Sequence, residues 1–334
     1  MSSMGVKNWG DDVIPWKWIS ASFVTPGAIA IDVPNYFTRR LVVMRENSER
    51  EGRIPLNHIG MFLSLHKVAL CAHILPVFIF DGPPELRKRN PNPGLVEKAS
   101  SFYKTFQQEG DPFNEEISAE LWRSPALRAY FAAAHLKDFG SIVGVPMLTA
   151  PSEAEMFAAV LCRDGAVKTV VSNDADALLF GSPHVTKQMQ LSSGRILSVA
   201  LTDFEKHLGL DVELLRDLAV VSGCDFHKKG VRGIGVKRGT VLLRRYGGLE
   251  GLLKAHGYSH AERSEFIEAR EVFDEASYMS AKDLCLTLNP PLVSKVIRTL
   301  ETIMSSERAE TIASKIVSLW RGFSNRQSTL EQWL

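Results

Sequence analysis

The sequence predicts an α/β fold, in which a central, mostly parallel sheet is flanked by helices. Three near-continuous apolar runs have strand length, and such runs are typical of strands buried on both faces. They cover residues 28–31, 77–80 and 169–171. Helical patterns alternate with these strands at residues 56–73, 125–143 and 152–163. This alternation indicates βαβ units and therefore parallel pairing of the strands.

The second half of the chain, from about residue 202, is predicted to be mostly helical. Helical patterns cover residues 211–221, 236–246, 261–272, 291–304 and 308–320. The Asn-Pro-Asn-Pro-Gly segment at residues 90–94 is expected to break any helix there. The first half of the chain is thus expected to be α/β and the second half α-helical.

The composition excludes several classes of protein. The chain has 334 residues, 45% apolar and 23% charged, which indicates a soluble, folded protein. No apolar run approaches the ~20 residues that span a bilayer, and the N-terminus lacks a signal-peptide pattern. The four cysteines lie far apart, which favours reduced intracellular thiols over zinc or disulfides. The net charge of +1 points to no class of partner, so only the distribution of charge along the chain is informative.

Each of the three predicted strands runs directly into an aspartate. Asp32 follows the first strand, Asp81 the second, and Asp174 and Asp176 the third. Ligands of open parallel sheets bind beyond the carboxyl ends of the strands, so these side chains are expected to gather at one edge. Clustered carboxylates repel one another unless a cation neutralises them, and their oxygens suit Mg²⁺ or Mn²⁺. The pattern therefore predicts a metal site.

Two more acids, Glu153 and Glu155, stand at the start of a predicted helix. Ser152 and Glu155 have the spacing of a capping box, and acids in a first turn favour the helix dipole. Local evidence alone favours the capping role for Glu155. Only the other carboxylates make these two residues candidate ligands.

Residues 226–246 form a basic stretch that holds seven Lys and Arg and no acid. Within it, the turn Gly233-Ile234-Gly235 precedes a predicted helix, so that backbone N–H groups can meet a phosphate. Its spacing is neither that of a dinucleotide fingerprint nor that of a Walker loop. One interpretation is a solvated basic face. The preferred one is contact with a nucleic-acid backbone without base reading.

Several motifs, taken in order, resemble the flap endonuclease family of structure-specific 5′ nucleases in the XPG-like superfamily. The resemblance covers nearly the whole chain and is closest to archaeal and eukaryotic members. The motifs are MGV at Met4, IAIDVPN around Asp32, PVFIFDGPPELRKR around Asp81, APSEAE around Glu153, VSNDADALLFGSP around Asp174 and VSGCDF with GVRGIGVKRG from Val221 onward. The resemblance implies a PIN-like nuclease fold with a helix–hairpin–helix at residues 230–246.

The resemblance also implies an active site with two Mg²⁺ ions, which Mn²⁺ can replace. Its seven carboxylates match Asp32, Asp81, Glu153, Glu155, Asp174, Asp176 and Asp225. The first four are expected to hold chiefly one ion and the last three the other, although Glu155 could cap its helix as well. Family members also carry a basic residue that stabilises the scissile phosphate. Arg87 matches it best, with Lys88 and Arg89 as close competitors.

In the family, the helix–hairpin–helix holds the duplex backbone, commonly with a bound K⁺. The implied DNA-binding residues are Gly5, Arg232, Gly233, Gly235, Lys237 and Arg238. The segment 85–124, expected to form the arch, departs from the family pattern because Pro91 and Pro93 interrupt it. Lys98 is the nearest counterpart of the second basic residue. Tyr36 or Phe37 is the candidate for the aromatic that stacks on a base.

The last eight residues, 327–334, resemble a sliding-clamp-binding peptide. The pattern consists of Gln327, Leu330, Trp333 and Leu334. Exposed apolar residues at a terminus lower solubility unless a partner covers them. A clamp such as PCNA is therefore the preferred partner, and a tail docked on its own domain is the alternative.

Together these features predict a single nuclease domain over residues 1–330. Its parts are an N-terminal portion (1–110), an internal portion (144–255) and a helical C-terminal region (256–324). The predicted protein is a monomer that cuts 5′ flaps in Okazaki-fragment maturation and repair, with 5′–3′ exonuclease activity and no membrane contact. The alternatives are a 5′ exonuclease or Holliday-junction resolvase of the same superfamily, or a non-catalytic scaffold that binds DNA and the clamp. The expected location is cytoplasmic, as in archaea, or nuclear in a eukaryote.

Overall fold

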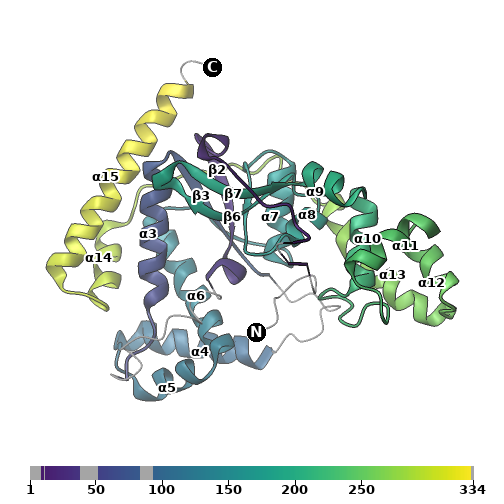
Figure 1. Cartoon of the computed structure of the whole chain (residues 1–334). Coiled ribbons are helices and arrows are strands. Elements are labelled where there is room, and N and C mark those ends of the chain that lie inside the picture. The colour runs from purple at the N-terminus through teal and green to yellow at the C-terminus, as the bar shows by residue number, and fades with distance from the viewer. Residues whose placement is uncertain (1–8, 11, 38–51, 83–92, 332–334) are drawn as a thin grey trace. The chain divides into compact units, whose positions relative to one another are not determined.

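The computed structural model describes residues 9–10, 12–37, 52–82 and 93–331, with residues 326–331 described by backbone alone. The chain divides into two compact units, each assembled from three separate stretches (Figure 1). Unit 1 comprises Met1–Phe23, Asp81–Pro91 and Ala150–Leu284, and unit 2 comprises Val24–Phe80, Asn92–Thr149 and Cys285–Leu334. Both units therefore combine residues from distant parts of the sequence.

The described part of unit 1 contains four strands in the order β1-β7-β6-β5. β1 (Lys17–Ser20) and β6 (His184–Gln190) pair antiparallel with β7 (Arg195–Ala200), whereas β5 (Val170–Val171) pairs parallel with β6. A short 3-10 turn, η2 (Leu191–Ser193), connects β6 to β7. It ends at Gly194, whose φ of 66° lies in the left-handed region that glycine enters without a steric penalty.

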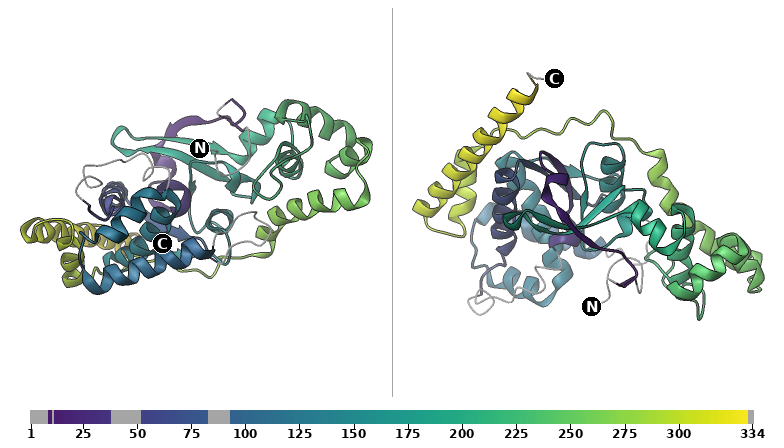
Figure 2. Two further views of the ribbon diagram at one scale, coloured as in Figure 1. Left: turned by 90° about the horizontal axis from the view of Figure 1, so that it is seen from below. Right: turned by 45° about the horizontal axis from the view of Figure 1, so that its top comes forward.

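Helices form the rest of unit 1. They are α7 (Ala154–Arg163), α8 (Asp176–Leu179), α9 (Leu201–Leu208), α10 (Val212–Ser222), α11 (Val236–Tyr246), α12 (Leu249–Ala255) and α13 (His260–Glu275), with 3-10 turns η1 (Ala21–Phe23) and η3 (Ala276–Tyr278). Local signals fix several starts: Asp211 caps α10, and Ser259 with Glu262 forms a capping box on α13. Figure 2 shows α10 to α13 grouped together.

Unit 2 contains three described strands, all parallel, in the order β2-β3-β4. They are β2 (Gly27–Asp32), β3 (Ile74–Phe80) and β4 (Met147–Thr149). Every residue of β3 is buried, which explains its uninterrupted apolar sequence. The helices of this unit are α3 (Asn57–Cys71), α4 (Pro93–Glu109), α5 (Glu115–Arg123), α6 (Pro125–Val143), α14 (Val293–Glu301) and α15 (Ser306–Glu331).

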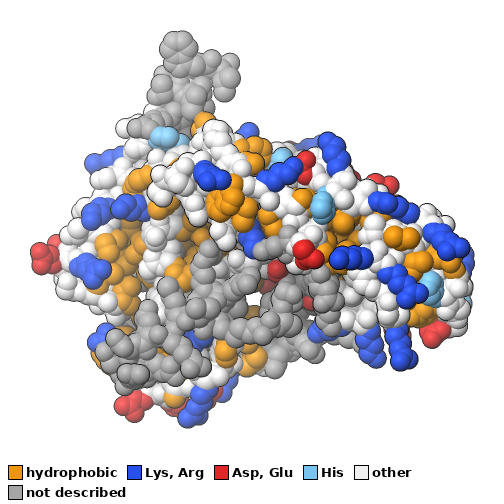
Figure 3. Space-filling model, viewed as in Figure 1, with side chains coloured by type: hydrophobic (Ala, Val, Ile, Leu, Met, Phe, Trp, Pro, Cys, Tyr) orange, Lys and Arg blue, Asp and Glu red, His pale blue; other side chains and the backbone are white. Residues whose placement is uncertain are grey.

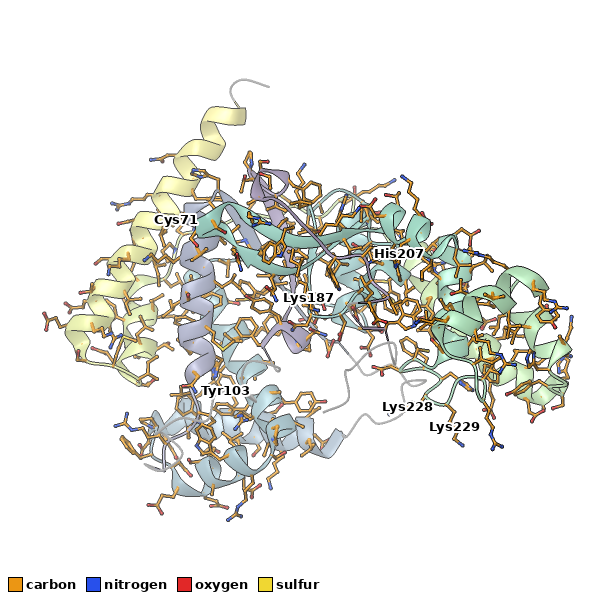
Figure 4. All side chains as sticks on the ribbon, in the orientation of Figure 1. Cys71, Tyr103, Lys187, His207, Lys228 and Lys229 are labelled. Atoms are coloured by element: carbon orange, nitrogen blue, oxygen red, sulfur yellow. The ribbon has the colours of Figure 1, made fainter. Side chains whose placement is uncertain are left out.

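Unit 2 has a helical core that also buries polar side chains. Its apolar members are Ile54, Leu56, Ala99, Tyr103, Phe106, Ile117, Leu121, Leu127 and Phe131. Beside them, His58 Nε2 lies 2.9 Å from His135 Nδ1, and the Tyr103 hydroxyl donates to Asp138 at 2.9 Å (Figure 4). Burial lowers the pKa of His135 to about 4, and burial with the charge of His135 lowers the pKa of His58 well below its usual value. These histidines are therefore neutral packing groups at neutral pH.

The predicted α/β fold is confirmed, and the predicted helices at 125–143 and 236–246 coincide with α6 and α11. The three predicted strands correspond to β2, β3 and β5. The expectation that residues 90–94 break a helix is wrong at residues 93 and 94, because α4 begins at Pro93. Proline is tolerated there since the first helical N–H groups have no intrahelical acceptor. None of the described helices combines the length and apolar character that a membrane span needs.

Candidate active site

Asp81, which directly follows β3 in the sequence, is bonded to the start of α7. Its Oδ1 accepts a hydrogen bond from the Ala154 backbone N–H at 2.9 Å. The next residue, Gly82, donates to the Ser152 carbonyl at 2.7 Å. A Cβ at Gly82 would clash with the carbonyl oxygen of Ala150, so this close approach requires glycine. The turn therefore brings Asp81 beside the two glutamates at the start of α7.

The two glutamates lie at the first turn of α7, but Glu155 does not form the predicted capping box with Ser152. Glu153 occupies the N-cap position, so Ser152 lies one residue too early to cap the helix. Glu155 instead accepts a hydrogen bond from the Ala177 backbone N–H at 3.0 Å. The capping interpretation of Ser152 and Glu155 is therefore wrong. Glu155 connects α7 to α8.

Asp174 and Asp176 follow β5, and both side chains are half-buried. Asp176 is the first residue of the single turn α8. Since the neighbouring Ala177 donates to Glu155, this turn is held against the acid-bearing end of α7. The bond brings the acids of α7 and α8 into one region of unit 1.

Asp225 lies just after α10 and shares a neighbour with Asp176. That neighbour is the buried Cys224 thiol. Its pKa is raised to about 12, chiefly by burial and further by the charges of Asp176 and Asp225, while backbone N–H groups of His227 and Phe226 oppose the rise. Since both carboxylates act on one thiol, the acid of α8 and the acid after α10 belong to the same region. A thiol with so high a pKa is itself no nucleophile at neutral pH.

Asp32 is the one predicted acid in unit 2, because the other six belong to unit 1. It is the last residue of β2 and only 3% exposed, and its Oδ1 accepts a hydrogen bond from the Asn35 N–H at 3.2 Å. β2 pairs in parallel with β3, with Asp32 opposite Ile79. Asp32 thus stands at the carboxyl end of its strand, as predicted.

The candidate ligands are carboxylates alone, with no His or Cys among them. Such a donor set fits a hard cation such as Mg²⁺ or Mn²⁺ and does not fit zinc. Among the described residues, no three His, Cys, Asp or Glu side chains lie close enough to hold one ion. The described acids therefore match the predicted metal by chemistry, without forming a closed coordination sphere.

A helix–hairpin–helix lies next to Asp225, formed by α10, the connecting loop and α11. Val231 N–H donates to the Val221 carbonyl at 2.8 Å, which folds the loop back on α10. Gly230 and Gly233 have φ of 58° and 74°, so both turns use the left-handed region. A Cβ at Gly239 would lie 2.7 Å from the Leu218 side chain, which shows how closely the two helices pack.

The outer surface of this motif is basic. Arg232, Lys237 and Arg238 are exposed, and no side chain caps the first turn of α11, which follows Gly235. Figure 3 shows Lys and Arg side chains over this group of helices, and Figure 4 shows Lys228 and Lys229 on the connecting loop. Arg244 differs, since its guanidinium donates to the carbonyls of Leu208 and Gly209 at the end of α9. Uncapped backbone N–H groups beside cations form a site suited to phosphate.

Three other sequence candidates are distinguished by their surroundings. Phe37 is 2% exposed and packs against Phe78, so it cannot stack on a base, whereas Tyr36 is half-buried. Lys98 on α4 forms an ion pair with Glu120 on α5. Tyr36 thus remains the aromatic candidate, and Lys98 has an acidic partner within its own unit.

Some predicted residues lie outside the described part of the chain. They are Gly5, Arg87, Lys88, Arg89, Trp333 and Leu334. Gln327 and Leu330 belong to α15, which extends to Glu331. Sequence reasoning also missed Gly82, although a Gly directly after Asp is a turn signal that could have identified it.

Comparison with known proteins agrees with this arrangement. The XPG I-region family model matches residues 144–225, the stretch from just before Glu153 to Asp225. The structure of flap endonuclease-1 from Methanococcus jannaschii superposes with a TM-score of 0.68 at 25% identity, covering 96% of this chain and 99% of that one. The fold and the acid-bearing stretch therefore define an XPG-type nuclease.

The curated relatives narrow the class to one family. Flap endonuclease 1 of Methanocaldococcus jannaschii is 29% identical over 333 residues, covering 96% of this chain and 98% of that protein. Flap endonuclease 1 of Cryptosporidium muris is 31% identical over 281 residues, but the match spans only 58% of that longer protein. The chain belongs to the flap endonuclease family of structure-specific nucleases.

Proposed function

We propose that this chain is a Mg²⁺-dependent endonuclease that cuts 5′ flaps at the junction of double- and single-stranded DNA. The observation that carries the proposal is the linkage of acids within unit 1. Asp81 is bonded to the start of α7, Glu155 is bonded to α8, and Asp176 and Asp225 act on one thiol. The last of these acids lies in the loop of the basic helix–hairpin–helix, so chemistry and DNA holding are adjacent in the chain.

The proposed metal ligands are the seven carboxylates Asp32, Asp81, Glu153, Glu155, Asp174, Asp176 and Asp225. Two divalent ions bound there would activate a water and stabilise the leaving oxygen of the phosphodiester. Like charges repel, so the carboxylates approach one another fully only when cations neutralise them.

The proposed task of the helix–hairpin–helix is to hold the duplex by its phosphates. The open first turn of α11 supplies backbone N–H groups, and Arg232, Lys237 and Arg238 supply positive charge. A K⁺ ion at the hairpin would add to this charge. Arg87, or its neighbour Lys88, would offset the charge on the scissile phosphate in the transition state.

We also propose a role for this chain in DNA replication and repair. Flap removal belongs to Okazaki-fragment maturation and repair, and a 5′–3′ exonuclease activity would follow from the same site. Gln327, Leu330, Trp333 and Leu334 would attach the enzyme, as a monomer, to a sliding clamp. The location would be cytoplasmic in an archaeon and nuclear in a eukaryote.

A cleavage assay tests the proposed activity. Labelled double-flap DNA, a four-way junction and a blunt duplex are incubated with the full chain in Mg²⁺, in Ca²⁺ and in EDTA. We expect one Mg²⁺-dependent cut at the flap base, with the other substrates nearly untouched. Flap binding without cleavage in Mg²⁺ or Mn²⁺ would support a scaffold instead. Preference for the four-way junction would support a resolvase.

A further inference from the structure

A part-buried ion-pair network joins α10 to α13 in unit 1. Arg216 Nη1 lies 2.8 Å from Glu213 Oε1 and 2.9 Å from Asp274 Oδ1. Arg270 pairs with Asp217 at 2.9 Å, with Asp274 at 2.8 Å and also with Glu213. Two guanidinium groups thus share three carboxylates, two of which come from α10 and one from α13.

The two arginines of this network are largely removed from solvent. Their side chains are 7% exposed for Arg216 and 13% for Arg270, unlike those of ordinary surface ion pairs. Burial lowers the pKa of Arg216, whereas the carboxylates around Arg270 outweigh burial and raise its pKa. The carboxylates differ in exposure, with Glu213 59%, Asp274 38% and Asp217 14% exposed. Removing a carboxylate therefore leaves a largely buried guanidinium without full compensation, whereas removing an arginine leaves Glu213 and Asp274 accessible to water.

The network also reaches two helices outside α10 and α13. Arg216 Nε donates to the carbonyl of Leu179, the last residue of α8, at 2.7 Å. Asp217 Oδ2 accepts from the N–H of Leu249, the first residue of α12, at 2.8 Å. The same side chains therefore fix the ends of α8 and α12 against the pair α10 and α13.

The contact with α8 is significant because that helix is a single turn. Asp176 begins the turn, and Arg216 binds the carbonyl at its other end. Arg216 itself belongs to α10, which ends at Ser222, shortly before Asp225. The turn also has local backbone bonds, from the Phe180 N–H to the Asp176 carbonyl at 3.3 Å and from the Ser182 N–H to the Ala177 carbonyl at 2.9 Å. Arg216 differs from these because it bonds the turn to α10.

We propose that Arg216 is a positioning residue, which fixes the turn bearing Asp176 relative to α10 and the helix–hairpin–helix. The inference rests on the proposed function insofar as Asp176 serves as a metal ligand. Arg216 touches neither the acids of the site nor the DNA-binding surface assigned above. Its loss should therefore raise the Mg²⁺ requirement of cleavage and leave flap affinity in Ca²⁺ unchanged.

The test uses two variants of Arg216 and one matched control. Arg216→Met removes the guanidinium, and Arg216→Lys keeps the buried charge but cannot reach three acceptors at once. Arg163→Met is the control, because Arg163 also donates to backbone carbonyls outside its own helix, those of Ala276 and Met279, and has no hydrogen bond or ion pair with the described residues of α8 or α10. For each protein, half-saturating Mg²⁺, flap affinity in Ca²⁺, thermal midpoint and metal-free amide exchange over residues 176–181 are measured.

We expect Arg216→Met to raise half-saturating Mg²⁺ about tenfold, in the range known for residues that orient metal ligands. Amide exchange over residues 176–181 should accelerate, because local opening of the turn becomes easier, and Arg216→Lys should fall between Met and wild type. Arg163→Met should lower the thermal midpoint and leave both quantities unchanged. Equal shifts of the Mg²⁺ requirement in Arg216→Met and Arg163→Met, or unaltered exchange in either Arg216 variant, would overturn the proposal.

The exchange measurement separates this inference from the proposed function. If the wild type cleaves no flap, the proposed function fails. Exchange over residues 176–181 in the metal-free protein still reports whether Arg216 fixes α8. Accelerated exchange in Arg216→Met with a normal Mg²⁺ requirement would contradict the role of Asp176 as a ligand and leave flap cleavage intact.

Discussion

Two groups of titratable side chains in this protein have opposite surroundings. In unit 1, Asp81 and Glu155 accept hydrogen bonds from backbone N–H groups at helix starts and stay partly accessible. In unit 2, His58 and His135 contact each other among aromatic rings and are fully buried. The first group keeps its charge available to a ligand, whereas the second is held neutral. Surroundings, more than residue type, separate a site from a polar core.

The largest effect is expected where an acid of unit 1 is removed. Asp174→Ala should lower flap cleavage by about 10³-fold, because electrostatic stabilisation at the reacting phosphate is lost. Binding of the flap in Ca²⁺ should remain, since Asp174 is distant in sequence from the basic residues of the helix–hairpin–helix. Single-turnover cleavage and fluorescence anisotropy measure the two quantities. Equal loss of both would mean that Asp174 has a structural role.

The buried histidines of unit 2 should give the next largest effect, as a pH dependence of stability. The pKa of His135 is about 4 when folded, below the 6.5 of a free imidazole, so the unfolded chain binds the extra proton. The stability that the neutral His135 ring contributes is fully present above pH 6.5 and is lost as the pH falls toward 4. Between pH 7 and pH 5, this one residue should lower the free energy of unfolding by about 2 kcal/mol.

Urea unfolding at the two pH values tests this expectation. His135→Gln should remove about 2 kcal/mol of the pH-dependent loss, whereas His207→Gln, at an exposed position on α9, should leave the loss unchanged. An unaltered pH dependence in His135→Gln would show that burial does not keep this ring neutral. The comparison between the two units would then lose its basis.

A smaller effect is expected at the basic surface of unit 1. Lys237→Ala should weaken flap binding several-fold and reduce the slope of log affinity against log salt by about 1, as expected for one lost phosphate contact. Lys254→Ala is the matched control, since Lys254 pairs with Glu250 at 2.8 Å on the neighbouring α12. A salt slope identical in the two variants would argue that Lys237 lies outside the DNA contact.

The smallest effect is expected at Lys98. Its pair with Glu120 is partly solvent-exposed, and such pairs contribute about 1 kcal/mol or less to stability. Lys98→Ala should therefore leave flap cleavage within about threefold of the wild type, while Arg87→Ala should lower it about 10²-fold. Loss of cleavage in Lys98→Ala comparable to that in Asp174→Ala would place a residue of unit 2 in the catalytic machinery.

The sequence predicted those parts of the fold that local patterns determine. α6 begins at Pro125, directly after its cap Ser124, and ends just before Gly144, so residues at its two ends determine its limits. β6, with the sequence HVTKQMQ, mixes polar and apolar residues and was missed, because only its pairing with β7 identifies it.

The candidate site divides in the same way. Strand ends and motifs identified the seven acids, but not what each carboxylate contacts. The capping box at Ser152 failed because Glu153 occupies the N-cap position and the Glu155 carboxylate accepts from Ala177, a residue 22 positions away. The partners of Arg216, from Leu179 to Asp274, are likewise set by tertiary packing. Local rules find the chemical groups, whereas long-range contacts fix their arrangement.

The interleaving of the two units has a consequence for synthesis of the chain. Unit 1 needs residues up to Leu284, and unit 2 needs the last helices, α14 and α15. A ribosome therefore releases Asp81 long before Asp225 and α13, which belong to the same unit. Neither unit can finish folding on a growing chain until its late residues emerge. A polypeptide that ends before residue 284 would thus lack part of unit 1 itself, in addition to α14 and α15 of unit 2.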